Sequence, residues 1–156
     1  MMRPDDPIHL RRAIVLSRRS RDDGHHPFAA ILVDASGAVI AEAMNDSAAD
    51  RTAHAEMLAL RRAAGTDAER MRGATLYSSA EPCAMCAGGV YWAGVGRVVY
   101  ALSEARLLLL TGSDPENPTL RLPCREVFAR GQREVEVVGP VLEDEAAAVH
   151  AGFWRT

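Results

Sequence analysis

Two short motifs constrain this chain more than any other feature, because each opens a predicted helix and both carry side chains that bind metals. The first is His54-Ala55-Glu56, and the second is Pro82-Cys83-Ala84-Met85-Cys86, which follows a predicted buried strand over 75–78. Cys83 and Cys86 are one helical turn apart, so both sulfurs can face the same point. Positive helix N-termini beside a metal would also favour thiolates over thiols.

Three of these residues, His54, Cys83 and Cys86, are ligands of the kinds that zinc takes. A structural zinc site has four protein ligands, whereas a catalytic site has three and leaves a position for water. The pattern therefore predicts a catalytic Zn²⁺ centre. Glu56 need not ligate the metal, and it can move protons beside a bound water whose pKa zinc lowers to about 7. A lone Cys-x-x-Cys is more often redox-active, structural or accidental than catalytic; the two motifs together indicate catalysis.

Length, charge and cysteine usage narrow the class of protein. A chain of 156 residues is expected to form a single domain over 1–156. The net charge of −3 favours a small-molecule substrate over a nucleic acid, which usually requires a basic surface. Three cysteines suit a reducing compartment, and Cys124, outside the motifs, is interpreted as a small buried hydrophobe. We expect a cytoplasmic protein with no membrane association, because no apolar run exceeds the short 107–110 segment.

Predicted strands and helices alternate along the chain. This alternation indicates an α/β fold with helices on both faces of one sheet. Strands are expected over 28–33, 39–44, 75–78, 97–101 and around Val135 to Val137. Helices are expected over 8–19, 54–64, 83–93, 104–110, 124–130 and 143–154.

The motifs resemble the cytidine deaminase superfamily, whose zinc nucleobase deaminases carry H-x-E and P-C-x-x-C. The segment from Glu81 to Gly88 is similar to the branch of guanine, cytosine and tRNA adenosine deaminases, and the similarity extends from about Ile8 to Trp154. It implies a three-layer α/β/α sandwich with a central five-stranded mixed sheet, and a homodimer. It also implies hydrolytic deamination of a free nucleobase or nucleoside, a guanine- or cytosine-type amino-heterocycle. In that reaction zinc hydroxide attacks, Glu56 shuttles protons and ammonia leaves.

The same resemblance suggests which residues bind the substrate. Phe28, in Pro27-Phe28-Ala29-Ala30, and Trp92, in Tyr91-Trp92, are expected to hold a planar ring between them. Asn45 and backbone groups near Ala55 are expected to bind its polar edge. Core packing is the alternative for the two aromatic residues, and turn capping is the alternative for Asn45.

Three further assignments concern the rim of the site. Asp114 is expected to be a second acid that touches the base, although Thr111-Gly112-Ser113-Asp114 departs from the usual pattern and makes Glu104 the substitute. Trp154, with its neighbour Phe153, is expected either to close over a pocket or to pack a terminal helix. His25 and His26 are interpreted as solvated loop residues.

Two other functions remain open from the sequence alone. A tRNA-specific adenosine deaminase would share nearly all the zinc-site residues, but it would need a basic groove for the anticodon loop. A zinc-binding module without chemistry would share the ligands but would have no use for Glu56. The sequence does not indicate which base or nucleoside is deaminated.

Overall fold

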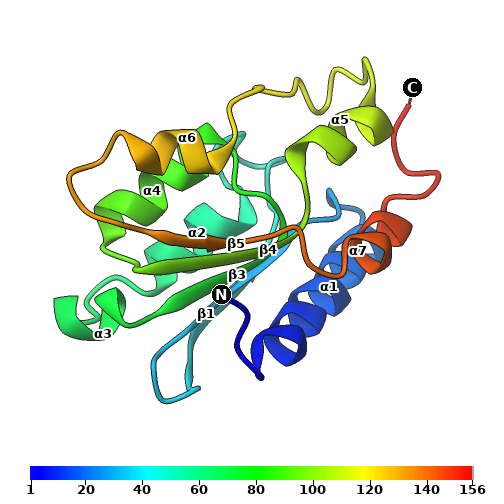
Figure 1. The fold of residues 1–156 in the computed structure, drawn as a ribbon. Helices are drawn as coiled ribbons and strands as arrows, with labels where there is room; N and C mark the ends of the chain where they lie inside the picture. The colour runs from blue at the N-terminus through cyan, green and yellow to red at the C-terminus, as the bar shows by residue number, and fades with distance from the viewer. Residues whose placement is uncertain (156) are drawn as a thin grey trace.

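A five-stranded mixed sheet forms the centre of the computed structural model, which describes residues 1–155 (Figure 1). The strand order is β2-β1-β3-β4-β5, with β1 antiparallel to both β2 and β3, whereas β3, β4 and β5 run parallel. The sheet predicted from the sequence is confirmed. The strands are β1 (Ala29–Val33), β2 (Val39–Met44), β3 (Thr75–Ala80), β4 (Arg97–Leu102) and β5 (Glu136–Val138).

Helices cover both faces of the sheet, as Figure 1 shows. The chain places α1 (Asp6–Asp22), α5 (Glu104–Thr111) and α7 (Glu143–Val149) on one face. The other face carries α2 (Ala55–Arg62), α4 (Ala84–Ala93) and α6 (Cys124–Ala129). Within residues 1–155, no helix is both long and apolar enough to cross a membrane.

The central strands contribute side chains to two separate hydrophobic cores, one on each face of the sheet. Leu76 and Val98 pack in the core beneath α2 and α4, whereas their neighbours Tyr77 and Val99 pack in the core beneath α1 and α7. Successive side chains of a strand point to opposite faces of the sheet, so a fully buried strand supplies both cores. This explains why β1, β3 and β4 are buried along their whole length.

The structure differs from the sequence prediction at two helices. A short helix that was not predicted, α3 (Ala68–Arg72), begins where the Asp67 side chain accepts a hydrogen bond from the backbone N–H of Arg70 at 2.9 Å. The last helix ends at Val149 rather than at Trp154. Gly152 then adopts a left-handed φ of 71°, which turns the chain instead of continuing the helix.

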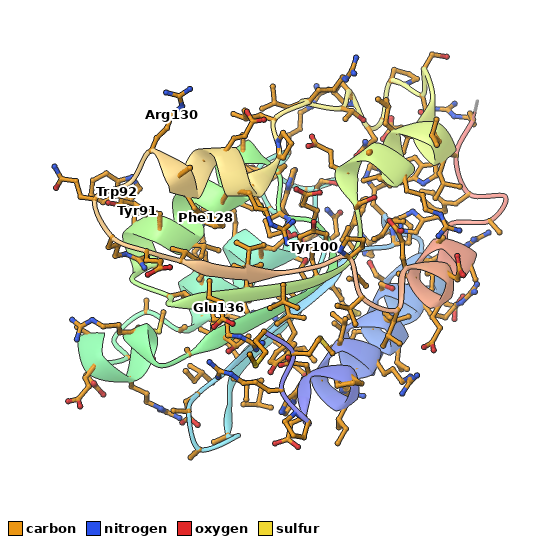
Figure 2. All side chains as sticks on the ribbon, viewed as in Figure 1. Tyr91, Trp92, Tyr100, Phe128, Arg130 and Glu136 are labelled. Carbon is orange, nitrogen blue, oxygen red and sulfur yellow. The ribbon has the colours of Figure 1, made fainter. Side chains whose placement is uncertain are left out.

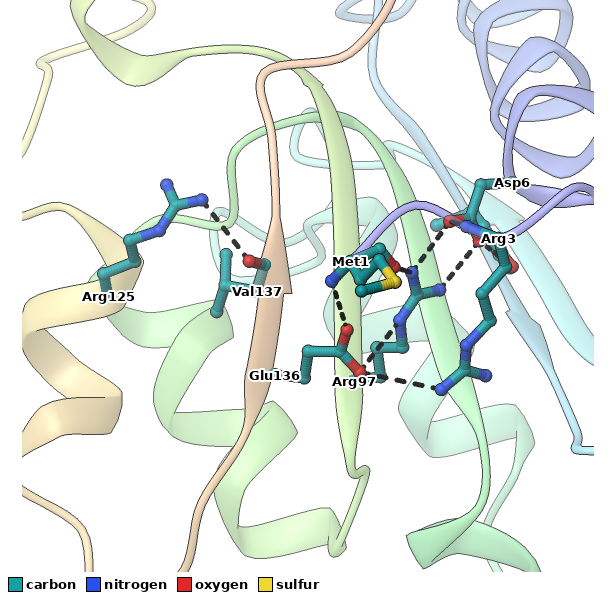
Figure 3. A network of polar contacts seen from close by, with 8 residues as sticks. Met1, Arg3, Asp6, Arg97, Arg125, Glu136 and Val137 are labelled. Atoms are coloured by element: carbon teal, nitrogen blue, oxygen red, sulfur yellow. Dashed lines mark hydrogen bonds and ion pairs between the residues drawn. The ribbon is translucent and has the colours of Figure 1, made fainter.

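A buried ion pair ties the N-terminal segment to the sheet. The Arg97 guanidinium on β4 donates two 2.7 Å hydrogen bonds to the Asp6 carboxylate, and the Tyr77 hydroxyl donates a third at 2.8 Å. Glu136 lies beside Arg97 and also pairs with the N-terminal amine (Figure 3). Burial alone would raise the pKa of Asp6, but these hydrogen bonds and one from the Arg3 N–H lower it to about 2.

The Asp6 pair should contribute strongly to stability. Replacing Asp6 with Ala removes the buried carboxylate that accepts two hydrogen bonds from Arg97 and leaves only the part-exposed Glu136 beside the guanidinium. We therefore expect the free energy of unfolding to fall by about 3–5 kcal/mol. Glu145→Ala is the control, because its pair with Arg11 is exposed and worth about 1 kcal/mol or less. Urea denaturation at pH 7 measures both. Equal effects of the two substitutions would contradict the assignment.

The same pair predicts an acid-sensitive component of stability. The carboxyl of Asp6 has a folded pKa of about 2 against an ordinary value of 3.8. Its stabilisation is therefore present above about pH 4 and lost as the pH falls toward 2, an effect of about 2 kcal/mol. Denaturation curves recorded between pH 5 and pH 2 should show this loss in the wild-type protein and not in D6A.

Candidate active site

The two sequence motifs meet where α2 and α4 begin. His54 and Cys83 immediately precede these helices and both have an extended backbone, which turns their side chains toward each other ahead of the first helical turn. The Nδ1 atom of His54 lies 3.6 Å from the Sγ atoms of both Cys83 and Cys86. The three candidate ligand atoms all lie within 4.8 Å of one another. The structure thus brings together the three residues predicted to hold a metal.

The spacing and chemistry of this cluster fit zinc. Zinc–sulfur bonds of about 2.3 Å and zinc–nitrogen bonds of about 2.0–2.1 Å at a tetrahedral angle place sulfur and nitrogen about 3.6 Å apart. The observed separations match that edge length. A hydrogen bond from Cys86 lowers the pKa of the Cys83 thiol to about 4, and the pKa of Cys86 is raised in turn. The lowered pKa of Cys83 favours the thiolate form that a metal ligand requires.

Glu56 lies in the first turn of α2, beside the cluster but not part of it. Its side chain is buried, and its Oε1 atom accepts a hydrogen bond from the Ser78 hydroxyl at 2.9 Å. The other oxygen, Oε2, lies 3.6 Å from Cys86 Sγ. Burial raises the pKa of this carboxyl. A carboxyl held at one oxygen and shielded from water is suited to accept and return a proton.

A cavity of about 690 Å³ opens onto these residues. Its floor includes His54, Glu56 and Cys83, and Phe28 and Asn45 form part of its wall. The rest of the lining comes largely from residues 47–51 and from the 112–123 loop, which joins α5 to α6. A volume of this size accommodates a small heterocyclic ligand.

Asn45 stands at the end of β2 with its amide fixed in one orientation. Its Oδ1 atom accepts hydrogen bonds from the backbone N–H of Ser47 at 3.0 Å and from the Ser47 hydroxyl at 2.8 Å. Its backbone N–H bonds to the carbonyl of Phe28, which joins the two predicted substrate residues across β1 and β2. With Oδ1 occupied, the amide presents its Nδ2 donors as the group available to a ligand.

Glu81 has a structural role that its place in the sequence did not indicate. Its carboxylate accepts the backbone N–H of Glu104 at 2.9 Å and that of Cys124 at 3.1 Å, so it joins the starts of α5 and α6. It also places a second acid near Glu104, which lines the cavity. Burial, and then the charge of Glu81, raise the pKa of Glu104.

The prediction that Cys124 is a buried hydrophobe is confirmed.

Trp92 does not line this cavity, which corrects the expectation that it stacks on the substrate opposite Phe28. Its side chain is 85% exposed and packs edge-on against Tyr91 near the end of α4 (Figure 2). Trp92 follows Cys83 by nine residues, which is about two and a half helical turns. It therefore points away from the side of α4 that carries the cysteines.

Asp114 lies behind the cavity wall and not on it, which corrects the expectation that it touches the base. Trp154 is not part of the wall either, which favours packing over the lid among its two interpretations. The Asp114 carboxylate accepts backbone N–H groups from Glu116 at 3.0 Å and from Arg155 at 2.6 Å, so it fastens the C-terminal segment to the 112–123 loop. Trp154 is buried, and its indole N–H bonds to His150 at 3.0 Å. Trp154 is therefore a packing residue of the C-terminal segment rather than a lid over the pocket.

Two assignments made from the sequence are left: the backbone near Ala55 and the pair of histidines before Phe28. Ala55 is fully buried as the first residue of α2, where a backbone N–H has no acceptor within the helix. Of the two histidines interpreted as solvated, His26 instead lines the cavity. Adjacent loop residues point in different directions, and the sequence offered no sign of which histidine would face inward.

The comparison with known families agrees with this geometry. Residues 4–102 match the family described as the cytidine and deoxycytidylate deaminase zinc-binding region, and they include both motifs. The chain belongs to this family. The resemblance seen in the sequence is therefore confirmed, and the chain is a member of a family of zinc-binding deaminases.

Relatives in this family differ in their named substrates. The chain is 41% identical to a probable cytosine deaminase of Schizosaccharomyces pombe, over 96% of this chain and 92% of that protein. It is 33% identical to the tRNA-specific adenosine deaminase of Bacillus subtilis, over 96% and 89%. The solved guanine deaminase of Nitrosomonas europaea is 28% identical with a TM-score of 0.73, covering 96% of this chain and 84% of that one.

The ligand cluster predicts a specific pattern of metal loss. We expect the wild-type protein to carry one zinc per chain and Cys86→Ala to lose it, since two ligands rarely hold the ion. Cys124→Ala removes a thiol outside the cluster and should retain the metal. Elemental analysis after dialysis measures zinc in each variant. Equal zinc content in the two variants would show that the metal binds elsewhere.

Proposed function

We propose that this chain is a zinc-dependent hydrolytic deaminase of a free nucleobase or nucleoside, a guanine- or cytosine-type amino-heterocycle. The observation that carries the proposal is the buried carboxyl of Glu56 next to a three-ligand cluster on the floor of a cavity. Three ligands leave one position of a tetrahedral ion for water, and Glu56 supplies a proton acceptor that a purely structural metal site would not need.

The chain's own residues account for binding and proton transfer. A zinc ion held by His54, Cys83 and Cys86 would act as a Lewis acid and lower the pKa of a bound water. The ring of Phe28 packs against the substrate ring, and the Nδ2 group of Asn45 donates to its polar edge. Glu56 accepts a proton from the attacking water and passes it to the ring nitrogen beside the amino-bearing carbon. The water oxygen bonds to that carbon. Glu56 then accepts the second proton from the added hydroxyl and delivers it to the amino group, so the carbon–nitrogen bond breaks, a carbonyl forms and ammonia leaves.

The charges around the cavity favour a small neutral substrate. The lining carries a single arginine, Arg51, against four glutamates: Glu56, Glu81, Glu104 and Glu116. An anticodon loop would bring phosphates to this surface, where carboxylates repel them and basic side chains are needed. Donor-rich heterocycles such as aminated purines and pyrimidines gain hydrogen bonds from the same carboxylates.

Substituting the proposed proton carrier tests the mechanism. We expect Glu56→Gln to keep its zinc and to lower kcat for ammonia release by at least a hundredfold, because the amide cannot accept a proton. The control is Glu69→Gln, an exposed residue on α3 that should change neither quantity. Zinc content and ammonia release from guanine and cytosine are measured on the same preparations. Near-normal turnover by E56Q would refute the role assigned to Glu56.

We also propose that the protein is a homodimer that buries the exposed Trp92 between two copies. An indole that is 85% exposed beside Tyr91 is the kind of aromatic side chain that anchors interfaces. Light scattering should give about twice the chain mass of 16.9 kDa, and Trp92→Glu should reduce it toward the monomer. Leu109→Glu, a similarly exposed apolar residue on α5, should stay dimeric. A monomeric wild-type protein would contradict this.

A further inference from the structure

The imidazole of His26 lies between two loops that border the cavity. Its Nε2 atom is 3.3 Å from the Oε2 atom of Glu116, on the 112–123 loop. Its Nδ1 atom is 3.4 Å from the Ser47 hydroxyl, on the loop that follows β2. His26 and Glu116 both line the cavity, so the ring bridges two parts of its wall.

The contact with Ser47 leads directly to Asn45. The same Ser47 hydroxyl donates to Asn45 Oδ1 at 2.8 Å, so a continuous polar chain runs from Glu116 through His26 and Ser47 to the Asn45 amide. With Oδ1 engaged by the backbone N–H and the hydroxyl of Ser47, the Nδ2 donors of the amide are left for a ligand. The orientation of Asn45 is thus connected to the placement of the 112–123 loop.

The surroundings of His26 hold its ring in this position. Its carbonyl accepts a 2.6 Å hydrogen bond from the Ser20 hydroxyl at the end of α1. Trp154 packs edge-on against the imidazole with ring centroids 5.2 Å apart, and Phe153 does so at 5.9 Å. A ring packed in this way makes specific contacts with little loss of side-chain freedom on binding.

We propose that His26 is a positioning residue that couples the 112–123 loop to the substrate-binding amide of Asn45. The inference rests on the proposed function, because it assigns Asn45 to substrate binding. The Nε2 atom contacts Glu116 and so holds the loop. The Nδ1 atom contacts the Ser47 hydroxyl and so holds the side chain of Asn45 in its binding orientation. The placement of the 112–123 loop and the orientation of the amide that would bind the ligand's polar edge are therefore linked through one imidazole.

Two substitutions of His26, each of which keeps one of its two polar contacts, separate the contact with Glu116 from the contact with Ser47. In His26→Gln the amide nitrogen takes the place of Nε2 and keeps the Glu116 contact, whereas in His26→Asn it takes the place of Nδ1 and keeps the Ser47 contact. Both variants lose the ring packing on Trp154, so the difference between them isolates the polar contacts. Hydrogen exchange of the amides of residues 112–123 measures, without any substrate, how firmly the loop is held. Steady-state kinetics measure the effect on substrate binding through Asn45.

We expect exchange in the 112–123 loop to be about fivefold faster in H26N than in H26Q. We expect Ser47→Ala to raise KM by about fivefold to tenfold in the H26N background, with kcat changed less than twofold, and to add little in the H26Q background. His25→Ala is the control. That neighbouring histidine does not line the cavity and should behave as the wild type.

Equal exchange rates and equal effects of S47A in the two backgrounds would overturn the coupling and leave His26 as a packing residue. A melting temperature that falls equally in both variants, with no difference in KM or exchange, would also overturn it. If the wild-type protein turns over no compound, the proposed function has failed instead. The exchange comparison would still decide whether His26 holds the loop.

Discussion

The close approach of α2 and α4 at their N-termini is the constraint on which the rest of the site depends. The cysteines belong to a helix that follows β3, whereas His54 and Glu56 open a helix that follows β2, so the sheet must set the distance between them. Gly89 permits the contact, because a Cβ at this position would lie 2.5 Å from the sulfur of Met57 on α2. Ser78, on β3 itself, completes the arrangement by fixing Glu56.

The candidate metal-ligand cluster and the layered fold could be predicted because each follows from short-range patterns. Residues one helical turn apart face the same point, and buried strands show as apolar runs, so the sequence is sufficient to place Cys83, Cys86 and the central strands. The prediction for Trp92 was wrong, although the same helical period, applied from Cys83, turns its side chain away from the cluster. Family resemblance suggested a stacking role at that position, whereas helical geometry decides where the side chain points.

The residues in the cavity wall and directly behind it could not be predicted, for a different reason. Asp114, Trp154 and His26 belong to loops or to the C-terminal segment, where the direction of a side chain depends on contacts far along the chain. The Asp114 carboxylate is occupied by the backbone of Arg155, 41 residues away, and no local pattern indicates such a partner. The relatives are named for different substrates, as a probable cytosine deaminase, a tRNA-specific adenosine deaminase and a guanine deaminase. A shared fold does not fix the substrate, so we expect specificity to be set by the residues around the cavity.

The most direct test of the proposed activity is ammonia release by the zinc-loaded protein from a panel of substrates. The panel contains guanine, cytosine, adenine, aminated triazines and pterins, the corresponding nucleosides, and a tRNA anticodon stem-loop. A cavity with one arginine and four glutamates predicts turnover of at least one free base or nucleoside and none of the stem-loop. Turnover of the stem-loop alone would contradict the small-molecule assignment, and zinc without any turnover would leave only a metal-binding module.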